Sequence, residues 1–355
     1  MSWSSFSLWR GRKGYSRGHE MTSASTTSTG RPLSEAFSSH KISLLDLAVW
    51  GTAVAVYFLF PTYLSLATTV LIMILFTLSL DLAVGYGGID TLGHAAFFGT
   101  GAYAAAFYAL HYSSEPLSGL VAAGLAAAII GVVSGILVLR TRGLTLIMLT
   151  LAIASMLQEF AVTAKDITGG DDGLTGYKID PVLGWFRFDI FRHTAYFYCL
   201  AVLAVAFVVC RIVVNSPFGL TVRGIRDNPV RMRLLGVPIR RRLVGLYTLS
   251  AALAGVAGGL SAQVTGVVGV DSLSFIASGN VLIMLILGGT GRLYGAFLGA
   301  AVFVVFSDRI AAIDPFNWLL ALGVMLILAV RFAPDGLISL AERLPKILPQ
   351  RRLIP

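Results

Sequence analysis

The sequence predicts an all-α fold, a polytopic membrane bundle of about ten transmembrane segments, some of them short or broken at glycines. Three observations predict this fold. The chain of 355 residues is 56% hydrophobic and only 13% charged, whereas soluble domains carry roughly 25% charged residues. Apolar runs near the length of about 20 residues that a membrane helix needs recur along most of the chain. The basic residues gather in the short loops between these runs, where they determine topology.

Three parts are expected along the chain. Residues 1–42 form a tail rich in Ser, Thr and basic residues, without the apolar core of a signal peptide. This composition predicts a disordered cytoplasmic extension. Residues 43–340 form the membrane domain, with a cytoplasmic segment at 215–243, and residues 341–355 form a second cytoplasmic tail. The two cysteines, Cys199 and Cys210, fall in one expected helix, which predicts packing residues rather than a disulfide or a metal site.

The apolar runs predict the membrane segments in order. The last three are less regular, because 280–289 is too short to span a membrane alone. We expect two shortened helices that meet at a glycine break there, with a re-entrant segment as the alternative. The predicted segments are 44–60, 64–84, a small-residue helix from near Leu92, 117–139, 144–164, 194–214, 244–264, 280–289, 296–308 and 318–331.

The charge distribution predicts the orientation of the segments. With the N-terminus inside, most of the 27 Lys and Arg residues fall in cytoplasmic pieces. This bias is typical of an even number of spans with both termini in the cytoplasm. The outside pieces hold only Lys165, Lys178, Arg187, Arg192 and Arg309.

Glycines predict both breaks and close packing. Gly85, Gly87 and Gly88 follow the second apolar run and are expected to end its helix. Small residues four positions apart share one helix face and let two backbones approach closely. Such pairs are Gly131 and Gly135, Gly255 and Gly259, and Gly295 and Gly299.

The stretch from Ser216 to Leu243 interrupts the apolar runs with seven arginines and one acid, Asp227. It contains the signals of a short helix, because Asn228 suits an N-cap and Pro229 the first helical position. Gly236 suits the residue after a helix C-terminus. The stretch is either a solvated topology determinant or a docking helix for a cytoplasmic partner.

A few polar residues lie in or beside the apolar runs. An ionisable residue inside a membrane helix is a functional candidate by default, but most of these lie near predicted helix ends, where they are expected to reach water. His94 lines a transport path or satisfies a backbone carbonyl freed by the glycine breaks. The residues are Asp81, His94, Gln158, Glu159, Gln263 and Asn280.

The largest predicted outside loop, about 165–193, contains the turn-rich stretch from Thr168 to Tyr177. Two adjacent acids, Asp171 and Asp172, lie in it. They lack the alternating ligand spacing of a calcium loop, so a turn or a protein contact is expected rather than a metal site.

No signature of catalytic chemistry occurs in the sequence. It has no G-x-x-x-x-G-K-[ST] phosphate loop, no H-E-x-x-H, no G-x-S-x-G and no C-x-x-C. The chain is therefore not expected to be an enzyme, to bind a cofactor or to hold a metal. Its net charge of +9 is explained by loops that determine topology, so no nucleic acid partner is expected. Membrane lipid is an expected partner.

Several stretches resemble the permease subunits of bacterial branched-chain amino-acid ABC importers. They occur in the order of that family and cover about 80–337. The chain is most similar to the larger of the two permeases that pair in such importers. The stretches are GYGGIDTLGHAAFFGTGAYAAA, TGGDDGL, SPFGLTVRGIRDNPVRMRLLGV, LSAALAGVAGGLSA, LGGTGRLYGAFLGA and FAPDGL.

The resemblance implies a permease domain at 43–340 in a bacterial inner (cytoplasmic) membrane. Its partners would be a second related permease, two cytoplasmic ATPase subunits that use ATP and Mg²⁺, and a periplasmic substrate-binding protein. It implies that 226–236 is the segment that couples to an ATPase, although Arg231, Met232 and Arg233 stand where relatives often carry a smaller residue. The coupling residues would be Arg223, Arg226, Asp227, Asn228, Pro229, Leu235 and Gly236.

Two further sites are expected in that setting. Thr91, His94 and Asn280 are candidates for the translocation path. The candidate loop for docking the binding protein contains Gly169, Gly170, Asp171 and Asp172.

The substrate and the class of transporter leave alternatives. Related permeases serve urea, short amides and aromatic compounds. A stand-alone secondary transporter or facilitative channel would usually show coupling-ion carboxylates in mid-membrane, and the sequence shows no row of them. A membrane enzyme is the third alternative, and no catalytic constellation favours it.

Overall fold

The computed structural model of the chain describes residues 44–59, 63–181, 193–314, 317–332 and 336–339. The predicted tails, 1–42 and 341–355, lie outside these residues. The chain divides into two compact units, residues 1–55 and 56–355. The first unit contributes the start of helix α2 (Leu44–Leu59), and the fold below is that of the second unit.

The described part of the second unit is almost entirely helical, which confirms the predicted fold class. Helix α3 (Leu64–Asp81) continues into a π-helical turn, η2 (Leu82–Tyr86). The remaining elements are α4 (Ala95–His111), α5 (Pro116–Val138), α6 (Leu144–Thr163), α7 (Lys165–Thr168), η3 (Gly170–Asp172), β1 (Leu174–Thr175), α8 (His193–Asn215), α9 (Pro217–Asp227), α10 (Pro229–Leu234), α11 (Ile239–Thr265), β2 (Val267–Val268), η4 (Val270–Leu273), α12 (Phe275–Gly288), α13 (Leu293–Ile313) and α14 (Trp318–Phe332).

Six helices of the described chain are long and apolar enough to cross a membrane: Leu64–Tyr86, Pro116–Val138, Leu144–Thr163, His193–Asn215, Ile239–Thr265 and Leu293–Ile313. The other predicted segments correspond to α2, α4, α12 and α14, which have 16, 17, 14 and 15 residues. The bundle is therefore polytopic, and a count of ten spans stays a prediction.

Four predicted boundaries are wrong, and one of them is the start of α12, which begins at Phe275 rather than at 280. Helix α11 begins at Ile239 rather than at 244, because its first turn carries Arg240, Arg241 and Arg242 and so does not register as an apolar run. Helix α13 begins at Leu293 and has 21 residues, so it is not a shortened helix. Helix α4 begins at Ala95 rather than near Leu92, since an irregular stretch follows the glycine break.

The bundle is packed around α11 through the predicted glycine pairs. A Cβ at Gly131 of α5 would lie 2.6 Å from the Cβ of Ala251, and a Cβ at Gly259 would lie 2.8 Å from that of Ala123. On α12 and α13, Gly299 lies against the backbone of Gly288. The prediction of close helix packing at these glycines is confirmed. An unpredicted approach is closer still, because Gly258 of α11 lies against the carbonyl of Phe98 on α4.

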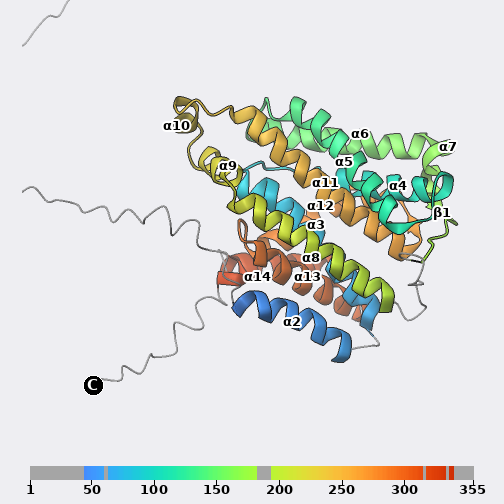
Figure 1. Cartoon of the computed structure of the whole chain (residues 1–355). Helices are drawn as coiled ribbons and strands as arrows, with labels where there is room; N and C mark the ends of the chain where they lie inside the picture. The colour runs from blue at the N-terminus through green and yellow to red at the C-terminus, as the bar shows by residue number, and fades with distance from the viewer. Residues whose placement is uncertain (1–43, 60–62, 182–192, 315–316, 333–335, 340–355) are drawn as a thin grey trace, which may run out of the picture. The chain divides into compact units, whose positions relative to one another are not determined.

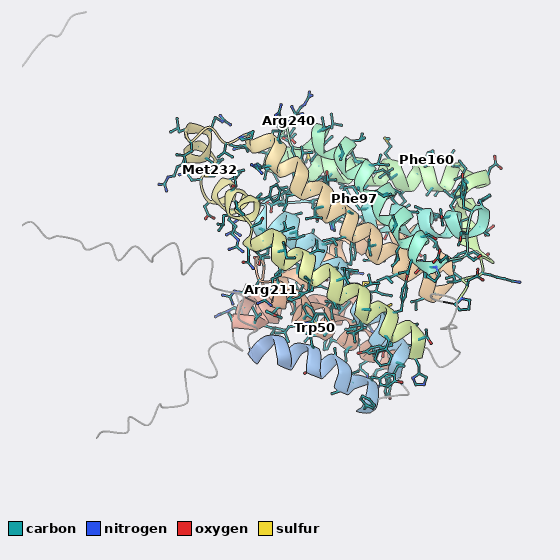
Figure 2. The ribbon with its side chains drawn as sticks, in the orientation of Figure 1. Trp50, Phe97, Phe160, Arg211, Met232 and Arg240 are labelled. Atoms are coloured by element: carbon teal, nitrogen blue, oxygen red, sulfur yellow. The ribbon has the colours of Figure 1, made fainter. Side chains whose placement is uncertain are left out.

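The two ends of α11 carry different structures (Figure 1). Helices α9 and α10 lie near its N-terminal end, while α7 and β1 lie near its C-terminal end. There, Leu174 pairs with Val268 and Thr175 with Val267 in a short antiparallel ladder. Figure 2 shows Met232 and Arg240 at the first end and Phe160 at the other. The arginine-rich segment and the acidic loop are therefore at opposite ends of the bundle.

Candidate functional site

Helix α10 is defined by caps at both of its ends. Asn228 accepts a hydrogen bond on Oδ1 from the Arg231 amide at 2.9 Å, and Pro229 occupies the first helical position. At the other end, the Gly236 and Val237 amides donate to the Arg233 and Met232 carbonyls at 3.0 and 3.1 Å. These two bonds form a Schellman motif around Gly236, whose φ is +77°. The helix predicted from Asn228, Pro229 and Gly236 is confirmed.

Helix α10 projects from the bundle and exposes apolar side chains. None of its residues is buried. Val230, Leu234 and Leu235 are 67%, 84% and 70% exposed. Large apolar groups clustered on a projecting polar element are typical of a protein contact surface. The exposed surface of α10 therefore suits a docking element better than a solvated loop.

Helix α9 connects α10 to the bundle, and the sequence analysis missed it. The Ser216 side chain caps it by accepting from the Gly219 amide at 3.3 Å, and Pro217 is its first residue. Val222 and Ile225, three positions apart, bury one face. The cap, proline and spacing signals that predict α10 are also present in 216–225, so they predict α9 as well.

Arg223 and Arg226 attach α9 to the end of α3. The Arg223 guanidinium lies over the Tyr86 ring, 4.8 Å from its centroid. Arg226 donates a hydrogen bond from Nη1 to the Gly85 carbonyl. Asp227 accepts from Arg226 Nε at 3.4 Å at the exposed end of α9. Arg223 and Arg226 therefore both contact the end of α3, while the role of these residues in coupling stays a prediction.

The Gly85 carbonyl belongs to a junction of three elements, formed by Asp81, Gly85, Arg226 and Gly291, which we call the glycine junction. Asp81 Oδ1 accepts a hydrogen bond from the Gly291 amide at 2.7 Å. A Cβ at Gly85 would lie against Asp81 Oδ1 and 2.9 Å from the Gly291 Cα. The junction thus joins α9, the end of α3 and the turn between α12 and α13.

Asp81 shows where reasoning from sequence failed. A carboxylate near a helix end was expected to reach water, but the Asp81 side chain is 0% exposed. Gly291, with φ of +75°, turns its amide toward this carboxylate. The signal that could have found the contact is an acid in an apolar run together with a glycine-rich turn later in the chain.

Two translocation candidates are buried inside the bundle. His94 and Thr91 are 1% and 4% exposed. His94 Nε2 and Ser79 Oγ are 2.9 Å apart and hydrogen-bonded, and the His94 ring stacks on Phe76 with centroids 5.7 Å apart. The partner of His94 Nε2 is thus a hydroxyl rather than a freed backbone carbonyl. These contacts hold the His94 ring inside the described bundle, and its place on a transport path stays a prediction.

Asn280, the third candidate, lies on a groove of about 640 Å³ between α3, α12 and α13. Apolar side chains dominate its surface, including Met73, Phe98 and Met284, with Asp308 and Ser307 at one side. Neither Thr91 nor His94 lines this groove. The three candidates therefore do not form one site. Phe76 lines the groove and stacks on the His94 ring, so it lies between His94 and the groove.

The loop with paired acids lies at the opposite end of the bundle and is linked to α11 by a hydrogen bond. Gly169 and Gly170 have φ of +76° and +66°, which gives the tight turn that presents Asp171 and Asp172 as exposed residues. The Tyr177 hydroxyl donates to the Ala262 carbonyl at 2.7 Å. Burial raises the pKa of Tyr177, so the hydroxyl remains a donor at neutral pH.

Among the described residues, no group of three or more His, Cys, Asp and Glu side chains gathers as metal ligands would. Asp171 and Asp172 are both exposed. Cys199 and Cys210 are both buried and free, in line with the packing role predicted for them.

Residues 62–330 match the family described as "Branched-chain amino acid transport system / permease component". The chain belongs to this family. It is 30% identical over 311 residues to the high-affinity branched-chain amino acid transport system permease protein LivM of Escherichia coli (strain K12), covering 81% of this chain and 71% of the relative. The LivM protein of Salmonella typhimurium gives the same identity and coverage.

A more distant relative is named for a different substrate. The fructose import permease protein FrcC of Rhizobium meliloti is 26% identical over 240 residues, which is 63% of this chain and 64% of the relative. No solved structure matches the chain.

Family membership makes this chain a permease component of a transport system, a membrane subunit and not an enzyme in its own right.

Proposed function

We propose that the chain is a transmembrane permease subunit of an ATP-driven importer for branched-chain amino acids. It forms half of a translocation path with a second, related permease in a bacterial inner membrane, with both termini in the cytoplasm. Two ATPase subunits supply the energy and bind ATP and Mg²⁺, and an extracytoplasmic binding protein delivers the substrate. The observation that carries the proposal is the family match over residues 62–330.

The geometry of α9 and α10 supports the coupling part of the proposal. Leu234 and Leu235 offer an ATPase an exposed apolar contact. Movement of α10 reaches α9 directly, and Arg226 links α9 to the backbone of the π-helical turn at Gly85. Asp81 then connects that turn to Gly291 between α12 and α13. A movement of α10 would therefore be transmitted through these contacts to α12 and α13, which border the groove.

The groove at Asn280 supports the substrate part. Its apolar side chains, such as Met73, Phe98 and Met284, suit an aliphatic side chain. Asn280 and Asp308 offer a few polar contacts to the charged groups of an amino acid. With the second permease opposite, the groove would form one wall of a shared path.

Uptake by the reconstituted transporter tests the proposal. We expect ATP-dependent accumulation of labelled leucine in proteoliposomes that contain this chain and its partner subunits, and competition by isoleucine and valine. Competition by urea, acetamide, benzoate or fructose instead would assign a different substrate. Uptake driven by an ion gradient without ATP would assign a secondary transporter.

Replacing Gly236 with valine tests the coupling role of α10. Gly236 has a left-handed backbone, and no atom lies within 4 Å of a Cβ built there, so the variant adds backbone strain without a clash. We expect uptake to fall by roughly tenfold, since 1.4 kcal/mol of strain corresponds to that factor. The permease should still insert, as measured by its amount in the membrane.

Gly266→Val is the matched control for this prediction. Gly266 ends α11 with φ of +72° and also has open space around its Cβ, but it lies at the opposite end of the bundle. It imposes the same kind of strain away from α10. Equal losses of uptake in both variants would contradict a coupling role for α10.

Replacing Asp171 and Asp172 with asparagine tests docking of the binding protein. Exposed rim charges mainly affect the rate of encounter and its salt dependence. We expect ATP hydrolysis stimulated by the binding protein to slow most at low salt, where screening is weak. Hydrolysis without the binding protein should stay unchanged. Identical salt curves for parent and variant would leave the loop as a connection only.

A further inference from the structure

A second and larger cavity, of about 1410 Å³, opens at the α9–α10 end of the bundle. It lies where α5 ends, α6 begins and α11 begins, and the segment from Pro229 to Pro238 borders it. Small-molecule pockets usually have volumes of about 300–1,000 Å³. This cavity is therefore large enough for a headgroup together with the adjoining part of its chains.

The cavity has a strongly positive lining. Its only acidic lining residue is Asp90. Of the lining arginines, only Arg226 forms a salt bridge with a carboxylate in the part of the chain that the structure describes, and its partner Asp227 points to the exposed end of α9. Six arginines from the turn between α5 and α6 and from helices α9, α10 and α11 line the cavity: Arg140, Arg142, Arg226, Arg233, Arg240 and Arg241.

Like charges gathered from separate segments repel one another unless an anion lies between them. Arg240 has an uncharged partner, because its Nη2 donates a hydrogen bond to the Ile136 carbonyl at 2.5 Å. This bond does not neutralise the charge of Arg240. A planar guanidinium also binds a phosphate oxygen pair in a bidentate manner. The arrangement suits a ligand that carries a phosphate group.

The walls of the cavity are aliphatic on the side of α5 and α6. Val132, Ile136 and Leu146 line it. The first turns of α6 continue this apolar surface outward, with Leu144 and Met148 largely exposed. Both helices are of membrane-spanning length. The cavity thus joins a basic region at the end of the helices to a surface that suits hydrocarbon chains.

We propose that this cavity binds an anionic phospholipid, with its phosphate headgroup among the arginines and its acyl chains along α5 and α6. Basic pockets between membrane helices on the cytoplasmic side bind such headgroups. An acidic protein surface would satisfy the arginines but not the aliphatic wall, which favours the lipid. The bound lipid would hold the turn at Arg140 and Arg142 close to the segment that carries α10. This inference goes beyond the proposed transport function and does not depend on the substrate.

Native mass spectrometry of the full chain, purified with its partner subunits, tests the proposal. The complex is titrated with phosphatidylglycerol or with phosphatidylcholine that has the same acyl chains. We expect the parent to bind phosphatidylglycerol in preference. An arginine near an anionic headgroup strengthens binding about fivefold, so Arg142→Gln combined with Arg241→Gln should weaken phosphatidylglycerol binding by roughly 30-fold. Thermal unfolding verifies that the variant remains folded.

Arg242→Gln is the matched control. Arg242 is the neighbour of Arg241 on α11, but it does not line the cavity, and its guanidinium lies 5.6 Å from the centroid of the Phe218 ring. Removing the same charge there should leave lipid binding unchanged, while Arg241→Gln alone weakens it. If the two single variants weaken binding equally, the proposal is overturned, because only general surface charge is then involved.

Two further outcomes would also overturn the proposal. If inorganic phosphate displaces phosphatidylglycerol from the parent completely, the cavity is a site for free anions. If the double variant loses its ATPase subunits during purification while lipid binding is unchanged, the arginines contact an acidic protein surface. If phosphate fails to displace the lipid and the ATPase subunits are retained, both results support a lipid site.

Discussion

Replacing Gly258 with valine is expected to destabilise the bundle strongly. A Cβ at this position would lie against the Phe98 carbonyl and 3.0 Å from the Ala102 amide nitrogen. These are backbone atoms of α4, which cannot move as a side chain can. Forcing extra atoms into a well-packed contact typically costs about 1–3 kcal/mol and occasionally more, and the immobile backbone places this variant at the upper end. Thermal unfolding of the purified chain should occur at a clearly lower temperature.

Gly279→Val is the control for this prediction. Gly279 is also a helical glycine, in α12, but no atom lies within 4 Å of a Cβ built there. The variant therefore makes the same chemical change without the clash. Unfolding of Gly279→Val at the temperature of the parent is expected. A Gly258→Val protein that unfolds with the parent would show that α4 and α11 are not in close contact.

Replacing Arg226 with alanine is expected to uncouple transport from ATP hydrolysis. The substitution removes the hydrogen bond from α9 to the Gly85 carbonyl. A hydrogen bond to a charged group is worth about 1.5–3 kcal/mol, which corresponds to a tenfold or greater loss of uptake. ATP hydrolysis without the binding protein should persist, because the ATPase subunits carry that chemistry. The measurement is the number of substrate molecules taken up per ATP hydrolysed.

Gly85→Ala disrupts the same junction from its other side. The added methyl group would lie against Asp81 Oδ1 and the backbone of Gly291. Because both variants break one contact, we expect the double variant to lose little more uptake than either single variant. Gly323→Ala, in open space on α14, should transport as the parent does. Losses that simply add would mean that Arg226 and Gly85 act independently.

Local signals in the sequence determined the membrane class and the helix α10. Asn228, Pro229 and Gly236 specify their cap and turn through hydrogen bonds that span only a few residues. For this reason they could be read without knowledge of the rest of the chain. The apolar runs predicted α5, α6, α8 and α14 within a few residues, since a membrane helix must satisfy its backbone within its own segment. The apolar runs did not predict the first turn of α11, because that turn is charged.

The tertiary structure alone decided which distant residues meet. Arg226 and Gly85 are 141 positions apart, and Asp81 and Gly291 are 210 positions apart. Neither contact follows from composition or spacing, because each depends on how closely the end of α3 approaches the turn at Gly291 and helix α9 in the folded chain. The same packing buried His94 behind Phe76 while it left Asn280 on a groove. It also brought six arginines from one turn and three helices around one cavity, which the sequence could not show because it records the charge of each segment but not the distances between segments.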